Sequence, residues 1–291
     1  MLTSIVDTLL QGILLGGLYA LFATGLSLAF GIMRMVNLAH GDFIILAAYA
    51  AMVGVQWSGV APLWMLLALV PLFALGGYGL QRVIFNPTLG RDMMPPLLVS
   101  FGLSVIVQNA LQEVFSADSQ RLQAEDLVTA SIRLSDDLSI GWFPVLVLLI
   151  SIATIVALQW IIGHTALGRA FRATSDDQEI VRLMGIDNRH IYGLAMALAS
   201  VVIAISGILL GMGTTFDPAL GPSRLLLAFE TVIIGGMGSM WGTLAGGMIL
   251  GVAQTIGFRV DPGWGGLFGH ASFLAVLLLR PSGLFPRTRD R

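Results

Sequence analysis

The sequence lacks cysteine and lysine. None of its 291 residues is a cysteine, and all 15 cationic side chains are arginines. Without cysteine there is no thiol nucleophile and no cysteine-held metal centre. Without lysine the chain has neither the P-loop residue that contacts nucleotide phosphates nor an amine for Schiff-base chemistry, so it cannot by itself be a P-loop ATPase.

Charge of either sign is also scarce. Only 11% of the residues are charged, whereas soluble proteins carry about 25%. Hydrophobic residues make up 56% of the chain, and the mean hydropathy is +0.87. This composition excludes a disordered chain and a basic nucleic-acid-binding domain, and it indicates an integral membrane protein with the lipid bilayer around it.

Long apolar runs predict helices that span the bilayer. A hydrocarbon core of about 30 Å needs about 20 apolar residues, and its lack of water forces each run to be helical. We predict spans at 9–33, 43–57, 63–81, 96–112, 142–163, 191–213 and 267–279. The glycine-dense stretch 225–258 predicts two short or broken passes, or a re-entrant segment. The expected fold is therefore all-α, a polytopic membrane helix bundle of about 8–9 spans in a single domain over 1–291.

The arginines orient these spans. Segment 164–190 and the C-terminal tail are rich in arginine, so both are expected in the cytoplasm; the residues are Arg169, Arg172, Arg182 and Arg189, and Arg280, Arg287, Arg289 and Arg291. Segment 118–137, which includes Asp136 and Asp137, has few arginines and is expected outside. Alternation then places the N-terminus outside and both Arg34 and 82–91, with Arg91, inside. It also requires 225–258 to turn back near 235–242.

Glycine pairs spaced four residues apart indicate close helix packing. Five such pairs occur in apolar segments, and glycine lets two helix backbones approach closely. The pairs are Gly12/Gly16, Gly207/Gly211, Gly242/Gly246, Gly247/Gly251 and Gly265/Gly269. We therefore expect a compact bundle.

Segment 164–190 contains an amphipathic pattern. Ser175 or Thr174 is placed to cap a short helix, and Asp176, Asp177 and Glu179 would favour the positive end of its dipole. An apolar stripe follows, formed by Ile180, Leu183 and Met184, and Gly185 is placed to end the helix. The pattern is typical of a surface helix lying on the bilayer, and equally of a helix that docks into a groove of a soluble partner.

Three separated motifs resemble one protein family. Residues 168–187, Gly-Arg-Ala-Phe-Arg-Ala-Thr-Ser-Asp-Asp-Gln-Glu-Ile-Val-Arg-Leu-Met-Gly-Ile-Asp, are similar to the cytoplasmic coupling segment in permeases of branched-chain amino acid ABC importers, the LivH/LivM type. Residues 30–42, ending in Asn-Leu-Ala-His-Gly-Asp, and the glycine-rich residues 231–247 resemble two further signatures of that family. The likeness extends in order from about residue 12 to Pro286, and it fits a LivH-like subunit.

The resemblance implies a transport subunit rather than an enzyme. It implies a multi-pass protein of the bacterial inner membrane that needs no cofactor or metal and moves branched-chain or hydrophobic amino acids, or a related small solute. The implied partners are a second permease subunit (a LivM-like paralogue or a second copy), two cytoplasmic ABC ATPase subunits and a periplasmic solute-binding protein. The residues implied in ATPase coupling are Gly168, Arg169, Arg172, Ala173, Asp176, Asp177, Ile180, Gly185 and Ile186. Val181 departs from the small residue expected there, which could alter how deeply the helix sits in its groove.

Two groups of polar residues lie in apolar surroundings. Asn37, His40 and Asp42 stand between two spans, where they should bond to each other or to loop carbonyls and fix the first hairpin; the alternative is a role in gating or in touching the solute. Glu230 is the one acid in 225–234, and it should face the bundle interior, water or a cation. It is either a buried structural acid paired with another span or part of the translocation path.

Glycines follow Glu230 directly. Gly235, Gly236 and Gly238 predict irregular backbone, which at membrane depth must be buried in protein or line a cavity. We place the translocation path beside 230–242. The turns at 217–222 and 259–264, with segment 118–137, would form the outer surface that meets a binding protein.

Two other classes of function stay open at this point. A secondary transporter or channel working without an ATPase would need ion-coupling acids at depth, and Glu230 is the only candidate. An intramembrane enzyme would need a catalytic constellation, but His164 and His190 lie at the interface and His270 is isolated in sequence.

Overall fold

A computed structural model describes residues 2–89, 94–135 and 138–285 of the chain. The predicted positions Arg91, Asp136, Asp137, Pro286, Arg287, Arg289 and Arg291 lie outside these ranges. The helices are α1 (Leu2–Met33), α2 (His40–Ser58), α3 (Met65–Leu80), α4 (Met94–Phe115), α5 (Glu125–Thr129), α6 (Trp142–His164), α7 (Ala166–Asp176), α8 (Gln178–Leu183), α9 (Asn188–Gly213), α10 (Gly221–Gly235), α11 (Met240–Val260) and α12 (Gly265–Leu279). Short turns of 3-10 or π helix are η1 (Pro62–Trp64), η2 (Gln81–Phe85), η3 (Asn86–Thr88) and η4 (Pro218–Leu220), and β1 (Ser131–Ser135) pairs antiparallel with β2 (Leu138–Gly141).

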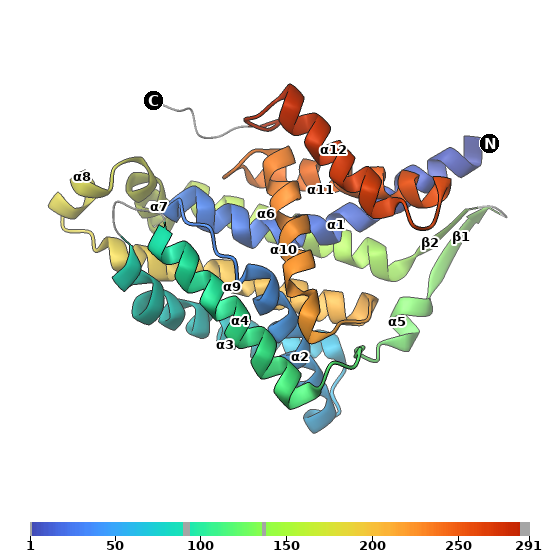
Figure 1. Cartoon of the computed structure of the whole chain (residues 1–291), viewed down its shortest axis with the longest axis horizontal. Helices are drawn as coiled ribbons and strands as arrows, with labels where there is room; N and C mark the ends of the chain where they lie inside the picture. The colour runs from blue at the N-terminus through green and yellow to red at the C-terminus, as the bar shows by residue number, and fades with distance from the viewer. Residues whose placement is uncertain (1, 90–93, 136–137, 286–291) are drawn as a thin grey trace.

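The helices confirm the predicted all-α membrane fold (Figure 1). Seven helical stretches in the described residues are long and apolar enough to cross a bilayer, and α12 is a shorter apolar helix. The glycine-dense stretch does contain two helices, α10 and α11, separated at 236–239. The expectation of two short passes is wrong for α11, because its 21 residues suffice to cross the bilayer.

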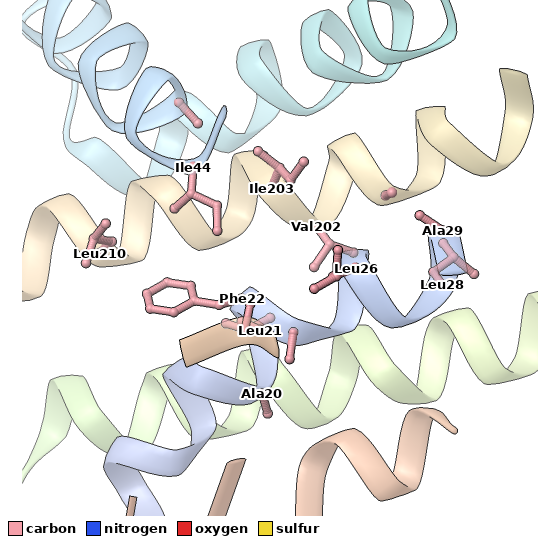
Figure 2. Packing of buried hydrophobic residues seen from close by; sticks show 14 of the residues in the cluster. Ala20, Leu21, Phe22, Leu26, Leu28, Ala29, Ile44, Val202, Ile203 and Leu210 are labelled. Carbon is pink, nitrogen blue, oxygen red and sulfur yellow. The ribbon is translucent and has the colours of Figure 1, made fainter. Parts of the chain in front are cut away.

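Helices α1 and α9 form the centre of the bundle. In their most apolar windows 78% and 72% of the residues are buried, against 17–28% in the stretches containing α3, α4 and α6. A helix that is apolar on all sides can be buried on all sides. Figure 2 shows Phe22 and Leu26 of α1 packed towards Ile44 of α2 and Val202 and Ile203 of α9. Helices α3, α4 and α6 instead leave large apolar side chains exposed on the outside of the bundle.

Glycines form the seam between α1 and α11. A Cβ added to Gly16 would lie 2.5 Å from the Cα atom of Met248, and one added to Gly247 would lie 2.5 Å from the carbonyl oxygen of Gly16. Gly12 and Gly251 repeat this contact one turn further along. The two backbones therefore touch, as the four-residue glycine spacing predicted.

Most of the described connections between helices lie at two opposite ends of the bundle. At the α7–α8 end, the Arg34 side chain donates to the Ser175 carbonyl at 3.3 Å, and Gly31 of α1 packs on Gly238. At the β1–β2 end, Arg259 of α11 donates to Ser4 of α1. The alternation of predicted spans is thus reproduced, with Arg34, Arg82 and segment 164–190 at one end.

Two helices begin inside the bundle. Arg34 takes a left-handed φ of 52°, residues 34–37 continue without helical structure, and α2 begins at His40. The His40 ring lies 2.8 Å from the carbonyl oxygen of Phe22, well inside α1. Gly221, the first residue of α10, packs against Gly41, and α10 crosses α1 steeply in Figure 1.

The glycine turn lies elsewhere than expected. Gly236 and Gly238 adopt φ of 101° and 78°, which favours glycine, and Gly238 packs on Gly31 near the end of α1. The turn therefore lies at the α7–α8 end rather than at membrane depth. Irregular backbone with buried side chains occurs instead at Met35 and Asn37, before α2, and at Phe216, before η4.

Candidate functional site

Two short helices, α7 and α8, connect α6 to α9. Thr165 caps α7 by accepting from the Gly168 amide at 3.1 Å, and Asp177 caps α8 by accepting from the amides of Glu179 and Ile180 at 2.9 and 3.0 Å. The predicted caps Ser175 and Thr174 are wrong, because both residues lie in the last turns of α7. The sequence offered several capping residues in a row, and only the break at Asp177 decides which one is used.

The predicted apolar stripe is exposed. Ile180, Leu183 and Met184 are 56%, 88% and 76% exposed, and α8 is the most distant element at its end of the bundle in Figure 1. Gly185 ends the helix with φ of 84°, as predicted. Val181 is buried against the chain's own bundle. Its departure from the family pattern therefore concerns this internal packing rather than the outward face.

The segment is held firmly by its two sides. Arg172 donates to the carbonyl of Ile162 at the end of α6, where Gly168 packs too closely to accept a Cβ. On the other side Asn188 donates to the Gln178 carbonyl at 2.8 Å, and Ile186 packs against the core. Of the predicted coupling residues, Gly168, Arg172 and Ile186 thus anchor the segment, and Ala173 is half-buried. Those exposed at the surface are Arg169, Arg172, Asp176, Asp177, Ile180 and Gly185.

Contacts from α3 and η2 also reach this segment. The Tyr78 hydroxyl lies 2.8 Å from Nδ1 of His190, and Arg82 forms an ion pair with Asp187 at 3.3 Å. Asn86 donates to the Arg189 carbonyl at 3.1 Å. The sequence assigned Arg82 only to orientation and gave no signal for these pairings, which join residues about a hundred positions apart in the chain.

The polar residues before α2 bond mainly to the main chain. Asn37 Oδ1 accepts from the Ala39 amide at 3.0 Å, and His40 contacts the Phe22 carbonyl. Among these described side chains the predicted mutual bonds are absent. The predicted loop carbonyls are not the partners either, because Asn37 accepts from a main-chain amide and His40 contacts a carbonyl inside α1.

Asp42 is different from its two neighbours. It is 1% exposed and lies in the first turn of α2, where the helix dipole favours a negative charge. Its carboxylate packs on Gly221, and Ser104 and Gln108 of α4 lie nearby without reaching hydrogen-bond geometry. The start of α2 and the start of α10 therefore meet around this side chain.

Glu230 is paired across two helices. Its side chain, 3% exposed, bonds to Nδ1 of His270 on α12, whose side chain is 45% exposed. Beside this pair, the Tyr19 hydroxyl donates to Gln254 Oε1 at 2.6 Å, and Gln254 packs on Gly269. His270 is therefore not isolated, and the acid has the partner on another span that one of the two interpretations required. Forty residues separate the pair, so local sequence gives no signal for it.

Loss of His270 is expected to destabilise the chain more than neutralising Glu230. His270→Ala leaves a buried carboxyl without its partner, which costs about 1–3 kcal/mol. Glu230→Gln keeps a group that can bond to the ring and should cost under about 1 kcal/mol. Thermal unfolding of both purified variants in detergent measures the order. A larger loss of stability in Glu230→Gln than in His270→Ala would contradict the conclusion that the Glu230 carboxyl is the buried member of the pair.

The other end of the bundle is hollowed. A cavity of about 740 Å³ lies between the end of α2, η1 and residues 120–124, and its lining includes Gln56, Trp64 and Arg121. This cavity adjoins segment 118–137, part of the surface predicted to meet a binding protein. Within 2–89, 94–135 and 138–285, no group of three His, Asp or Glu side chains could hold a metal ion.

Comparison with known proteins adds to this geometry. The family model described as branched-chain amino acid transport system / permease component matches residues 8–277. The chain is 29% identical to the branched-chain amino acid permease BraD of Pseudomonas aeruginosa, over 96% of this chain and 95% of BraD. It is 26% identical to LivH of Salmonella typhimurium, over 95% and 94% of the two chains.

More distant likenesses also occur. The fructose import permease FrcC of Rhizobium meliloti is 28% identical over 68% of this chain and 58% of its own length. PsaBC of Streptococcus pneumoniae, solved with a Fab, has a TM-score of 0.46 at 14% identity over 97% of each chain, a likeness too distant to carry an argument. The family match spans nearly all the helices described above, so the chain belongs to the family of permease components of branched-chain amino acid transport systems.

Proposed function

We propose that this chain is the permease subunit of an ABC importer for branched-chain or hydrophobic amino acids, or a related small solute. The exposed stripe of Ile180, Leu183 and Met184 carries the proposal, because it is an apolar face on a helix projecting from the bundle beyond the membrane-spanning helices. The stripe fits the groove of a soluble partner. The lack of lysine means that nucleotide hydrolysis must come from that partner.

The remaining parts of the assembly follow the same proposal. The α7–α8 end lies on the cytoplasmic side of the bacterial inner membrane and binds two ABC ATPase subunits. The N-terminus lies on the outer side. A second permease subunit, a paralogue or another copy, completes the path. A periplasmic binding protein delivers solute to the β1–β2 end, where the cavity beside residues 120–124 opens.

The mechanism is a shift between two conformations rather than chemistry in this chain. Movement of the ATPases displaces α7 and α8, which are bonded to α6, to α9 and, through Arg82 and Asp187, to η2. The α2–α10 crossing at Gly41 and Gly221 is the point at which the bundle interior would open. The energy of ATP binding thus biases an equilibrium between outward-open and inward-open states.

Proteoliposomes distinguish this proposal from a secondary transporter, for which buried Glu230 is the supporting observation. Vesicles holding both permease subunits and the ATPases, with leucine-loaded binding protein outside, are expected to concentrate labelled leucine only with ATP. Vesicles that lack the ATPases are expected to show none. Concentrative uptake without ATPase subunits, driven by an ion gradient, would contradict the proposal.

A further inference from the structure

Arg224 has a position unlike that of the other arginines. It lies in the first turn of α10, which begins in the bundle interior where Gly221 packs on Gly41 and Asp42. Among residues 2–89, 94–135 and 138–285, the remaining arginines lie in β1, in the short helices α7 and α8, at helix ends or in connections. Because a cation at membrane depth is expensive, its presence there is a sign of function.

The Arg224 guanidinium lacks a partner within the described part of the chain. Its buried Nε–H donates no hydrogen bond, and the residue forms no ion pair there. Tyr19 and Asp217 lie within electrostatic range. The Tyr19 hydroxyl is already bonded to Gln254, and Asp217 Oδ1 accepts from the Ala219 amide at 2.9 Å. The Arg224 guanidinium therefore has a hydrogen-bond donor free for an anion from outside the chain.

The surface beside Arg224 is open and mixed in character. Pro222, Ser223 and Leu226 are exposed on the first half of α10, and Thr214 and Thr215 are exposed in the segment that leads to it. Exposed hydroxyl groups and an exposed apolar side chain therefore lie within a few residues of Arg224 along the chain. The positive end of the α10 dipole adds to its attraction for an anion.

These groups match the parts of an apolar amino acid. A carboxylate pairs with a guanidinium in bidentate geometry, and Leu226, two residues further along α10, offers an exposed apolar side chain. Glu230 follows Arg224 on the same helix, and Tyr19 lies within electrostatic range of both. An uncharged sugar would leave the guanidinium unpaired.

We propose that Arg224 binds the carboxylate of the transported solute and thereby selects amino acids over uncharged solutes. This inference rests on the proposed function, because a solute contacts Arg224 only if the chain forms a translocation path. It adds the residue that recognises the carboxylate of the solute.

The test compares Arg224→Gln, Arg224→Lys and the control Arg280→Gln in the complete importer, reconstituted in proteoliposomes with ATP inside. Arg280 lies just after α12 at the α7–α8 end, away from the α2–α10 crossing. With leucine as the probe, Arg224→Gln is expected to lower uptake about tenfold or more, since one charge-assisted pair is lost. Arg224→Lys should retain part of the uptake, and Arg280→Gln should match the wild type.

Two further measurements, assembly of the importer and uptake of fructose, distinguish failure of the Arg224 assignment from failure of the proposed function. Uptake of leucine by Arg224→Gln at the wild-type rate would overturn the assignment. So would a loss of assembly with the second permease subunit in size-exclusion chromatography, because Arg224 would then be a subunit contact. A wild-type importer that carries fructose but not leucine, isoleucine or valine would instead show that the proposed solute class is wrong.

Discussion

Replacement of Ile180, Leu183 and Met184 by serine is expected to abolish ATP-driven uptake while the bundle stays folded. All three side chains are more than half exposed, so their loss should change the free energy of unfolding by under about 0.5 kcal/mol each. Docked in a groove, each would contribute about 1.5 kcal/mol or more from burial. Together they would weaken ATPase association about a thousandfold.

Two measurements check this result. Co-purification of the ATPase subunits with the triple variant should fail, and leucine uptake in proteoliposomes should fall to the level without ATP. Ile132→Ser, which also alters an exposed apolar residue but at the β1–β2 end, should bind the ATPases normally. Normal association and uptake in the triple variant would contradict the docking role of α8.

Gly16→Ala is expected to have the largest effect on stability. The added Cβ would lie 2.5 Å from Met248 Cα and 2.6 Å from the Gly247 carbonyl oxygen, both of them main-chain atoms. No side chain can rotate away, so α1 and α11 must separate along their whole seam. Overpacking costs typically 1–3 kcal/mol, and a backbone clash is expected at about 3 kcal/mol or more.

The matched control is Gly102→Ala on α4. Nothing lies within 4 Å of a Cβ added there, and alanine is favoured over glycine in a helix by about 1 kcal/mol. Thermal unfolding in detergent should therefore show opposite signs: a fall of about 6–12 °C for Gly16→Ala and no fall for Gly102→Ala. An unchanged midpoint in Gly16→Ala would show that the seam is looser than described.

The sequence was sufficient to predict most of the membrane-spanning helices, because apolar length and helix formation are linked in a bilayer. It predicted the break in 225–258 from glycine density, and close helix packing from pairs such as Gly12 and Gly16, but not that these two residues pack on α11. It did not predict that α2 and α10 begin inside the bundle. Residues 34–39 and 214–220 are short, and only packing against Phe22 and Gly41 fixes their depth.

The site was predictable where its chemistry is local. The stripe at Ile180, Leu183 and Met184 and the helix end at Gly185 follow from spacing within one segment. The partner of Glu230 does not, because His270 lies on another helix and a single sequence carries no signal for a contact between distant positions. The sequence placed the cap of this helix at Ser175 or Thr174, two or three residues before Asp177, which caps it in the structure. The prediction failed because several neighbouring side chains are able to cap a helix.

The last described residues also limit which parts can move separately. The amides of Leu284 and Phe285 donate to the carbonyls of Ile234 and Gly235, the final turn of α10, at 2.9 and 3.0 Å. The stretch after α12 is thereby fastened to the α10–α11 turn, so these three helices form one mechanical block despite the glycines between them. A hinge in this protein has to lie at the margin of that block, where α10 meets α2, and not at its most glycine-rich point.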